Sequence, residues 1–323
     1  MYSVRDFGGM ITDDVRRTAY LAAIRKFAPG ARVLDLGCGT GFFTLAALEL
    51  GAEHVTAIDL ADGVRLLPQV IAQNGYQDRC DVYHGDVAHL KAEPYDLIIS
   101  DLRGRLPLFR NQFAVISDVR QRLLKSGGVF LPARDKIVCG LVEVNNWWNK
   151  TTEPYRQDDH NWDAYIQYEL SQATRLNDLC EDNLISNTHV WDEIEYSDLA
   201  GLSKKYRGND FKLSATKSGS CHGLVVWFET QLTDDIGYST GPSSHLPTYG
   251  RQLFPFAHVA GIQSGQSVGI SLHANFVQDD WMWEWALETE SQSVTHSTLD
   301  RLPLGDSVEK SNVLECVKCQ KIL

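Results

Sequence analysis

The sequence predicts an α/β fold, a parallel sheet covered by helices on both faces, followed by a second, β-rich domain. Strands and helices alternate along the first 132 residues, which is the pattern of a parallel sheet. A glycine-rich turn joins the first strand to its helix, and beyond Asp135 the pattern changes to short strands between Gly, Ser and Asp turns. A chain of 323 residues suits two such domains.

Hydrophobic periodicity places the elements of the first domain. Apolar positions at helical spacing predict a helix over 11–28, which Pro29-Gly30 ends. After it we expect strands at 31–36, 55–59, 81–84, 95–100 and 129–132, and helices from the glycine turn to about 50, at 64–74 and at 113–124. The strand at 95–100 is nearly all apolar, so both of its faces should be buried.

The second half of the chain has a different organisation. Residues 136–144 alternate like a half-buried strand, and 147–187 are polar and aromatic with helical stretches near 161–171. Several short strands are expected over 188–285, and the chain from 288 is polar and aperiodic. We therefore expect domains at 1–135 and 136–287, with a helical insertion at about 147–187 and a partly mobile tail at 288–323.

Charge and cysteine content exclude several classes of function. The net charge of −12 argues against a nucleic-acid partner, and no apolar run is long enough to span a membrane. The N-terminal residues lack the apolar core of a signal peptide, and seven scattered cysteines indicate a reducing, cytoplasmic location. Cys316 and Cys319 form half of a zinc motif without a second pair, so we expect no metal site.

The turn Gly37-x-Gly39-x-Gly41 between a strand and a helix suits a phosphate or a nucleoside, because glycines let the backbone approach a ligand closely. Phe42 stands where a dinucleotide-binding turn would need its third glycine. Asp59 ends the next strand, where a carboxylate can accept bonds from both ribose hydroxyls. These features favour a nucleoside-containing cofactor other than NAD.

The run from Val33 to Gly41, VLDLGCGTG, resembles the first motif of class I methyltransferases. That resemblance implies a Rossmann-like domain that binds S-adenosyl-L-methionine. The residues that it implies in cofactor binding within this domain are Asp35, Gly37, Cys38, Gly39, Gly41, Asp59, Leu60, Asp86, Val87 and Ser100.

The segment from Met10 to Tyr20 is similar to the helix that covers the cofactor in protein arginine methyltransferases. By that resemblance Met10 packs near the sulfonium and Arg16 holds the cofactor carboxylate, a contact that arginine makes well. The rest of the chain resembles the same family, in which a β-barrel domain follows and the helical insertion is a dimerisation arm. The resemblance thus implies a head-to-tail homodimer.

The acceptor side departs from that family, whose members bind guanidinium with two glutamates nine residues apart. Asp101 stands in place of the first glutamate and Arg110 in place of the second, while Tyr249 and Gly250 replace a histidine and a tryptophan. Two unit charges about 4 Å apart interact by about 4 kcal/mol at an effective dielectric constant near 20. Arg110 should therefore repel an arginine acceptor, unless it turns outward or pairs with Asp101.

Three arginines, Arg103, Arg105 and Arg110, lie beside the expected methyl-transfer site and suit an anionic group. Our hypothesis is a small-molecule acceptor that carries such a group and is methylated on nitrogen or oxygen, with Asp101 orienting or deprotonating it and Tyr249 donating a hydrogen bond. The alternatives are a protein arginine methyltransferase with a remodelled hairpin, and a catalytically silent scaffold.

Overall fold

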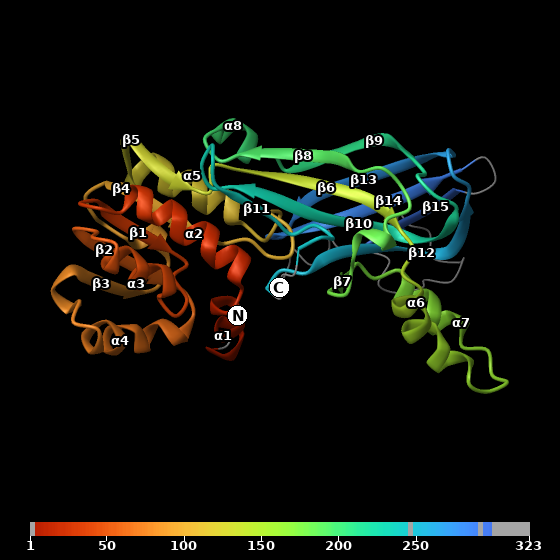
Figure 1. The fold of residues 1–323 in the computed structure, drawn as a ribbon, viewed down its shortest axis with the longest axis horizontal. Helices are drawn as coiled ribbons and strands as arrows, with labels where there is room; N and C mark the ends of the chain where they lie inside the picture. Colours follow the sequence, from red (N-terminus) through yellow and green to blue (C-terminus); the bar gives the residue numbers. More distant parts are fainter. Residues whose placement is uncertain (1–3, 245–247, 290–292, 299–323) are drawn as a thin grey trace, which may run out of the picture.

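The computed structural model describes residues 4–244, 248–289 and 293–298, and the chain forms two units side by side along its long axis. In Figure 1 the α/β unit, red to yellow, occupies one end and the β-rich unit, green to blue, occupies the other. The division follows the change of pattern that the sequence shows near Asp135.

The N-terminal unit is built on a parallel five-stranded sheet with the order β3-β2-β1-β4-β5. Its strands are β1 (Arg32–Leu36), β2 (His54–Asp59), β3 (Cys80–His84), β4 (Tyr95–Ser100) and β5 (Leu124–Leu131). The chain moves outward from β1 to β3 and then returns to β4 on the other side of β1. Ligands of such sheets bind at this reversal, at the carboxyl ends of the strands.

Helices pack on the sheet as the hydrophobic pattern predicts, with one difference at the N-terminus. They are α1 (Val4–Ile11), α2 (Asp14–Phe27), α3 (Phe42–Glu49), α4 (Leu67–Gln73) and α5 (Gln112–Leu123), with 3₁₀ turns η1 (Asp62–Leu66), η2 (Gln77–Arg79) and η3 (Val87–His89). The helix expected over 11–28 is confirmed as α2, but it begins three residues later, because the buried Asp13 caps α2 by accepting the N–H of Arg16. Asp13 also separates α2 from α1, a helix that the sequence did not predict.

The C-terminal unit consists of two antiparallel sheets. The first contains β6 (Arg134–Val142), β7 (Thr174–Leu176), β8 (His189–Glu195), β10 (Gly219–Gln231), β11 (Gly237–Ser239) and β12 (Arg251–Ile262), and the second β9 (Tyr206–Ser214), β13 (Ser267–Val277), β14 (Asp280–Glu288) and β15 (Ser293–Ser297). Aromatic side chains fill the space between the sheets, with Trp283 packed against both Trp191 and Phe254. The two sheets form the expected barrel domain.

Part of the segment in which a tail was expected, residues 293–297, forms strand β15. Strand β15 pairs with β14, and the buried His296 stacks on Trp285 while accepting the N–H of Ala257. An edge strand obtains its backbone hydrogen bonds from its neighbour without an apolar pattern of its own, which is why the sequence did not reveal it. Cys316 and Cys319 lie outside the described residues.

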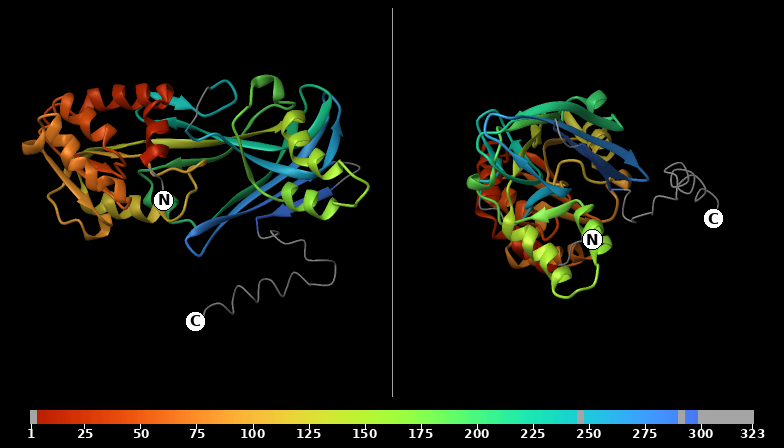
Figure 2. Two further views of the ribbon diagram at one scale, coloured as in Figure 1. Left: turned by 90° about the horizontal axis from the view of Figure 1, so that it is seen from below. Right: turned by 90° about the vertical axis from the view of Figure 1, so that its right-hand side faces the viewer.

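A helical insertion interrupts the barrel between β6 and β7, and it begins two residues before the predicted range of about 147–187. It comprises α6 (Asn145–Thr152), η4 (Glu153–Arg156) and α7 (Asp163–Leu170), and two further short turns, η5 (Glu181–Asn183) and α8 (Leu199–Leu202), follow it. Trp148, Ile166 and Leu170 form its own small core. The insertion projects away from the barrel at the end far from the N-terminal sheet (Figures 1 and 2).

Candidate active site

The glycine-rich turn lies at the carboxyl end of β1 and has the backbone that only glycine adopts readily. Gly37, Gly39 and Gly41 have φ angles of +73°, +57° and +82°. A Cβ atom at Gly39 would lie 2.7 Å from the ring of Phe7, so α1 packs closely over the turn. The turn therefore needs its glycines both for its backbone and for the close approach of a neighbour.

Asp59, at the end of β2, is bonded to this turn. One carboxylate oxygen accepts the N–H of Gly39 at 2.7 Å, and the other accepts the N–H of Ala61 at 2.7 Å. Asp59 is only half-buried, and an ionised carboxylate can accept further bonds, so it remains able to receive a pair of ribose hydroxyls. Leu60, beside it, is 60% exposed and offers an apolar contact.

Asp35 is buried within β1, and its carboxylate is bonded to another side chain of the protein. The Thr44 hydroxyl donates to it at 2.6 Å, which joins β1 to α3. Burial raises the pKa of Asp35 to about 7, partly offset by the Thr44 bond. The resemblance implied that Asp35 takes part in cofactor binding, and in the structure its carboxylate accepts the hydroxyl of Thr44. Burial likewise raises the pKa of the Cys38 thiol.

The remaining residues expected around the cofactor lie at the same edge of the sheet. Asp86 caps η3 by accepting the N–H of Ala88, and Val87 is buried beside it. The backbone oxygen of Ser100, at the end of β4, accepts the hydroxyl of Tyr20 at 3.0 Å. The structure thus gathers the predicted set along the ends of four neighbouring strands.

Asp101 follows β4 and is held by two arginines. Arg16 Nε donates to one carboxylate oxygen at 2.6 Å, and Arg103 donates to the other through Nε at 3.1 Å and Nη2 at 3.0 Å. The Tyr249 hydroxyl lies 2.7 and 2.6 Å from the two oxygens. Burial acts to raise the pKa of Asp101, but the two arginines outweigh it and lower the pKa. Asp101 is therefore an ionised carboxylate.

Arg103 is buried inside the protein, with a side chain that is 2% exposed. Besides Asp101, it donates to Asp135 through Nη1 at 2.9 Å and to Tyr20 through Nη2 at 2.6 Å. Tyr238 and Thr230 also accept bonds from it. The expectation that Arg103 faces an anionic substrate is therefore wrong, because carboxylates and hydroxyls of the chain itself take all of its nitrogens.

Asp135, at the start of β6, completes this arrangement and was not singled out from the sequence. It is fully buried and accepts bonds from Arg103, Thr230 and, at 2.6 Å, Tyr196. We refer to Arg16, Arg103, Asp101 and Asp135 as the four-charge cluster, which joins the two domains and carries no net charge. No local motif marks Asp135, since 32 residues separate it from its arginine partner.

Arg110, predicted as an acceptor-side residue, lies outside the four-charge cluster. It is exposed, has a φ of +45° and packs its guanidinium over the ring of Phe109. Arg105 is also exposed and donates to Gln252 at 3.2 Å.

Met10 is half-buried, and its backbone oxygen accepts Arg16 Nη1 at 3.2 Å. Asp101, Tyr249, Arg16 and Met10 are thus brought together, and Arg110 is not.

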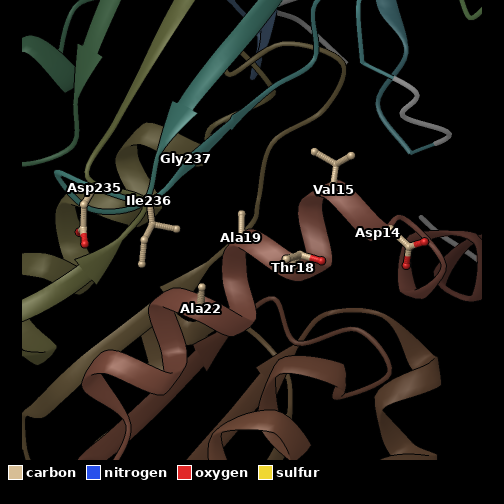
Figure 3. A pocket seen from close by; sticks show the side chains of 8 residues that line it. All are labelled: Asp14, Val15, Thr18, Ala19, Ala22, Asp235, Ile236 and Gly237. Atoms are coloured by element: carbon tan, nitrogen blue, oxygen red, sulfur yellow. The ribbon is translucent and has the colours of Figure 1, made fainter.

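An open groove lies on the outer face of α2 (Figure 3). It has a volume of about 560 Å³, and the residues around it are Asp14, Val15, Thr18, Ala19, Ala22, Asp235, Ile236 and Gly237. Arg16 and Tyr20 point to the other face of the same helix, where they contact Asp101 and Ser100. The groove is therefore distinct from the site at the strand ends.

Two family models match the chain in consecutive parts. Residues 27–171 match a methyltransferase domain, and residues 146–292 match the arginine methyltransferase oligomerization subdomain. Protein arginine N-methyltransferase 1 of Dictyostelium discoideum is 26% identical over 270 residues, which cover 80% of this chain and 78% of that protein. The enzyme of the same name from Saccharomyces cerevisiae is 26% identical over 275 residues, covering 80% and 77%.

Solved structures share the fold. The Trypanosoma brucei PRMT1 enzyme-prozyme heterotetrameric complex with AdoHcy contains a chain that superimposes with a TM-score of 0.80 at 17% identity, covering 90% of this chain and 97% of that one. Protein arginine methyltransferase 10 of Arabidopsis thaliana superimposes with a TM-score of 0.75 at 20% identity, with the same two coverages. At these identities the likeness establishes the architecture alone.

Proposed function

Because the chain is a class I S-adenosylmethionine-dependent methyltransferase that resembles the protein arginine methyltransferases, we propose that it methylates arginine-type acceptors on proteins through a remodelled hairpin. The observation that carries this proposal is the position of Asp101. It is a buried, ionised carboxylate at the end of β4, bonded to Arg16 at the reversal of the sheet.

The residues at the strand ends fit the cofactor. Asp59 would receive the ribose hydroxyls, the glycine turn would lie against the nucleoside, and Arg16 with Met10 would hold the amino-acid end. When bound, the cofactor supplies an electrophilic methyl group on a sulfonium. The task of this chain is then to align the acceptor for an in-line displacement and to exclude water.

Charge at the four-charge cluster supports a cationic acceptor. If Arg16 serves the cofactor carboxylate, Asp101 and Asp135 face Arg103 alone and leave one negative charge in excess. Arg110 is exposed and packs over the ring of Phe109, so solvent would screen its repulsion of a cationic acceptor. With its lowered pKa, Asp101 orients an acceptor by charge and is a weak base. Burial raises the pKa of Tyr249, so its phenol stays a hydrogen-bond donor.

A second candidate is an uncharged nitrogen or oxygen acceptor. It is favoured by one observation, that both oxygens of Asp101 already accept hydrogen bonds within the chain. The hypothesis of a small anionic acceptor loses its main binding residue, because Arg103 is buried and all of its nitrogens are bonded within the chain. Only the exposed Arg105 and Arg110 would remain for an anionic group.

Assembly and location complete the proposal. The oligomerization subdomain spans the helical insertion, so we propose a head-to-tail homodimer in which the insertion contacts the partner. Light scattering that shows a monomer at micromolar concentration would contradict this.

Five cysteines of the described residues are free thiols, which suits a cytoplasmic location. No helix within the described ranges has the length and hydropathy to cross a membrane.

Methyl transfer from labelled S-adenosylmethionine tests the proposal. Cell extract would be separated into protein and small-molecule pools, and arginine peptides would be compared with lysine peptides of the same sequence. We expect label in the protein pool and on arginine. Label confined to small molecules would contradict the main proposal. Binding of S-adenosylhomocysteine without transfer to either pool would favour a silent scaffold.

A further inference from the structure

Five side chains surround the guanidinium of Arg103 with oxygen atoms. Two are carboxylates, Asp101 and Asp135, and three are hydroxyls, those of Tyr20, Thr230 and Tyr238, which contribute from both domains. Each nitrogen of Arg103 donates to at least one of them. Such a set of acceptors, shielded from water, is what a planar guanidinium requires.

The guanidinium of Arg103 also bonds to Asp101, the carboxylate that would bind the acceptor. Two nitrogens of Arg103 bond Oδ1 of Asp101, and Arg16 with Tyr249 takes Oδ2. The side chain of Asp101 is 8% exposed. An arginine from a substrate would have to share or displace bonds that Arg103 already makes.

On the premise of the proposed function, we propose that Arg103 is the specificity-determining residue of the acceptor site, an internal arginine that competes with a substrate guanidinium for Asp101. It weakens binding of peptidyl arginine and leaves uncharged acceptors unaffected. Arg103 acts through Asp101, so it is a positioning residue and takes no part in the chemistry.

The variant that tests this is Arg103→Met combined with Asp135→Asn. The second change is needed because Asp135 is fully buried and would otherwise lose its cationic partner. Binding of an arginine peptide would be measured by calorimetry with S-adenosylhomocysteine present. A peptide with citrulline at the same position reports binding that does not depend on charge.

We expect the double variant to bind the arginine peptide about tenfold more tightly than wild type or better, a change of about 1.4 kcal/mol. Citrulline-peptide and S-adenosylhomocysteine affinities should stay within about twofold. In turnover, the gain should lie in KM rather than kcat. Arg103→Lys keeps a positive charge beside Asp101, so its affinity for the arginine peptide should rise less than that of the double variant. Arg25→Met, an exposed arginine in the last turn of α2, is the matched control and should change nothing.

Unchanged arginine-peptide affinity in a folded double variant that binds S-adenosylhomocysteine would overturn the inference, as would an equal gain for the citrulline peptide. If the double variant does not fold, Arg103→Gln combined with Asp135→Asn replaces it, because both new side chains are polar and neutral and leave no buried charge unpaired at position 135. Tighter binding without methylation would uphold the role of Arg103 and refute the proposed function. Methylation of arginine peptides by wild type, with no increase in peptide affinity in the variant, would uphold the proposed function and refute the role of Arg103.

Discussion

Two aspartates with largely buried side chains, Asp35 near the end of β1 and Asp101 directly after β4, lie among partners of different charge. Asp35 has a neutral partner, Thr44, and its pKa is raised to about 7. Asp101 is bonded by Arg16 and Arg103, and its pKa is lowered although its side chain is only 8% exposed. The partners of a buried carboxylate, more than its burial, decide whether it is charged.

The same contrast separates the two halves of the site. The cofactor half depends on backbone and on contacts between residues close in sequence, such as Thr44 with Asp35 nine residues away and Gly39 with Asp59 twenty away. The acceptor half depends on ion pairs that join distant segments, such as Arg16 with Asp101, 85 residues apart. Substitutions in the cofactor half should therefore change the structure locally. Substitutions in the acceptor half should weaken the four-charge cluster, which joins the two domains.

The largest effect is expected from Asp135→Ala. It leaves the buried Arg103 without one of its two carboxylates, and breaking a buried ion pair costs about 3–5 kcal/mol. Denaturant unfolding should show a loss of that size in the free energy of unfolding. Asp198→Ala, which removes an acid that caps the short α8 at the surface, is the control and should cost about 1 kcal/mol. A loss below about 1 kcal/mol for Asp135→Ala would show that the four-charge cluster contributes little.

Asp35→Asn should change the pH dependence of stability. The pKa of Asp35 is raised in the folded state, so its contribution is fully present below the unfolded value near 3.9 and is lost as pH rises through about 7. Wild type should lose up to about 4 kcal/mol between these limits relative to the variant. Unfolding curves at pH 4, 5.5 and 7 measure this, and parallel profiles for the two proteins would refute a raised pKa.

Asp59→Ala should weaken cofactor binding through the loss of bonds to the ribose and of the bond to Gly39. Hydrogen bonds to charged groups contribute about 1.5–3 kcal/mol, which corresponds to about tenfold to a hundredfold in affinity. Calorimetry with S-adenosylhomocysteine gives the value. Asp62→Ala, three residues on and largely exposed, should leave it unchanged. Equal affinities for wild type and Asp59→Ala would place the cofactor elsewhere.

A smaller effect is expected from Tyr249→Phe. The phenol donates to Asp101, whose charge two arginines still balance, so the loss of unfolding free energy should be about 1–2 kcal/mol. Tyr206→Phe, a largely exposed tyrosine of β9, is the comparison and should cost less. A loss above about 4 kcal/mol in the free energy of unfolding would mean that Tyr249 stabilises the contact between the domains as strongly as Asp135.

Arg110→Glu should have the least effect. It restores an anion to the hairpin, but at an exposed position outside the four-charge cluster. We expect KM for an arginine peptide to change by less than about threefold, since exposed charges contribute little. An improvement of tenfold or more would show that the hairpin closes over the acceptor in the working enzyme.

The sequence predicted the local structure around the expected cofactor site well because its signals are local. Glycines with left-handed backbone, a strand-ending acid and an alternation of strands and helices are all visible within about thirty residues. The acceptor half was predicted only in part. Asp101 was found through a resemblance, but the spacing that pointed to Arg110 could not reveal that Arg103 turns inward. Its partner Asp135 was expected at the end of the first domain, but it lies in β6 of the C-terminal unit and carries no pattern of its own.

A crystal structure with bound S-adenosylhomocysteine is the most direct test of the proposed site. We expect the ribose hydroxyls on Asp59, the amino-acid carboxylate on Arg16, and Arg103 still bonded to Asp101 and Asp135. A product bound away from Asp59 and Arg16, or an Arg103 side chain turned out into solvent, would contradict it.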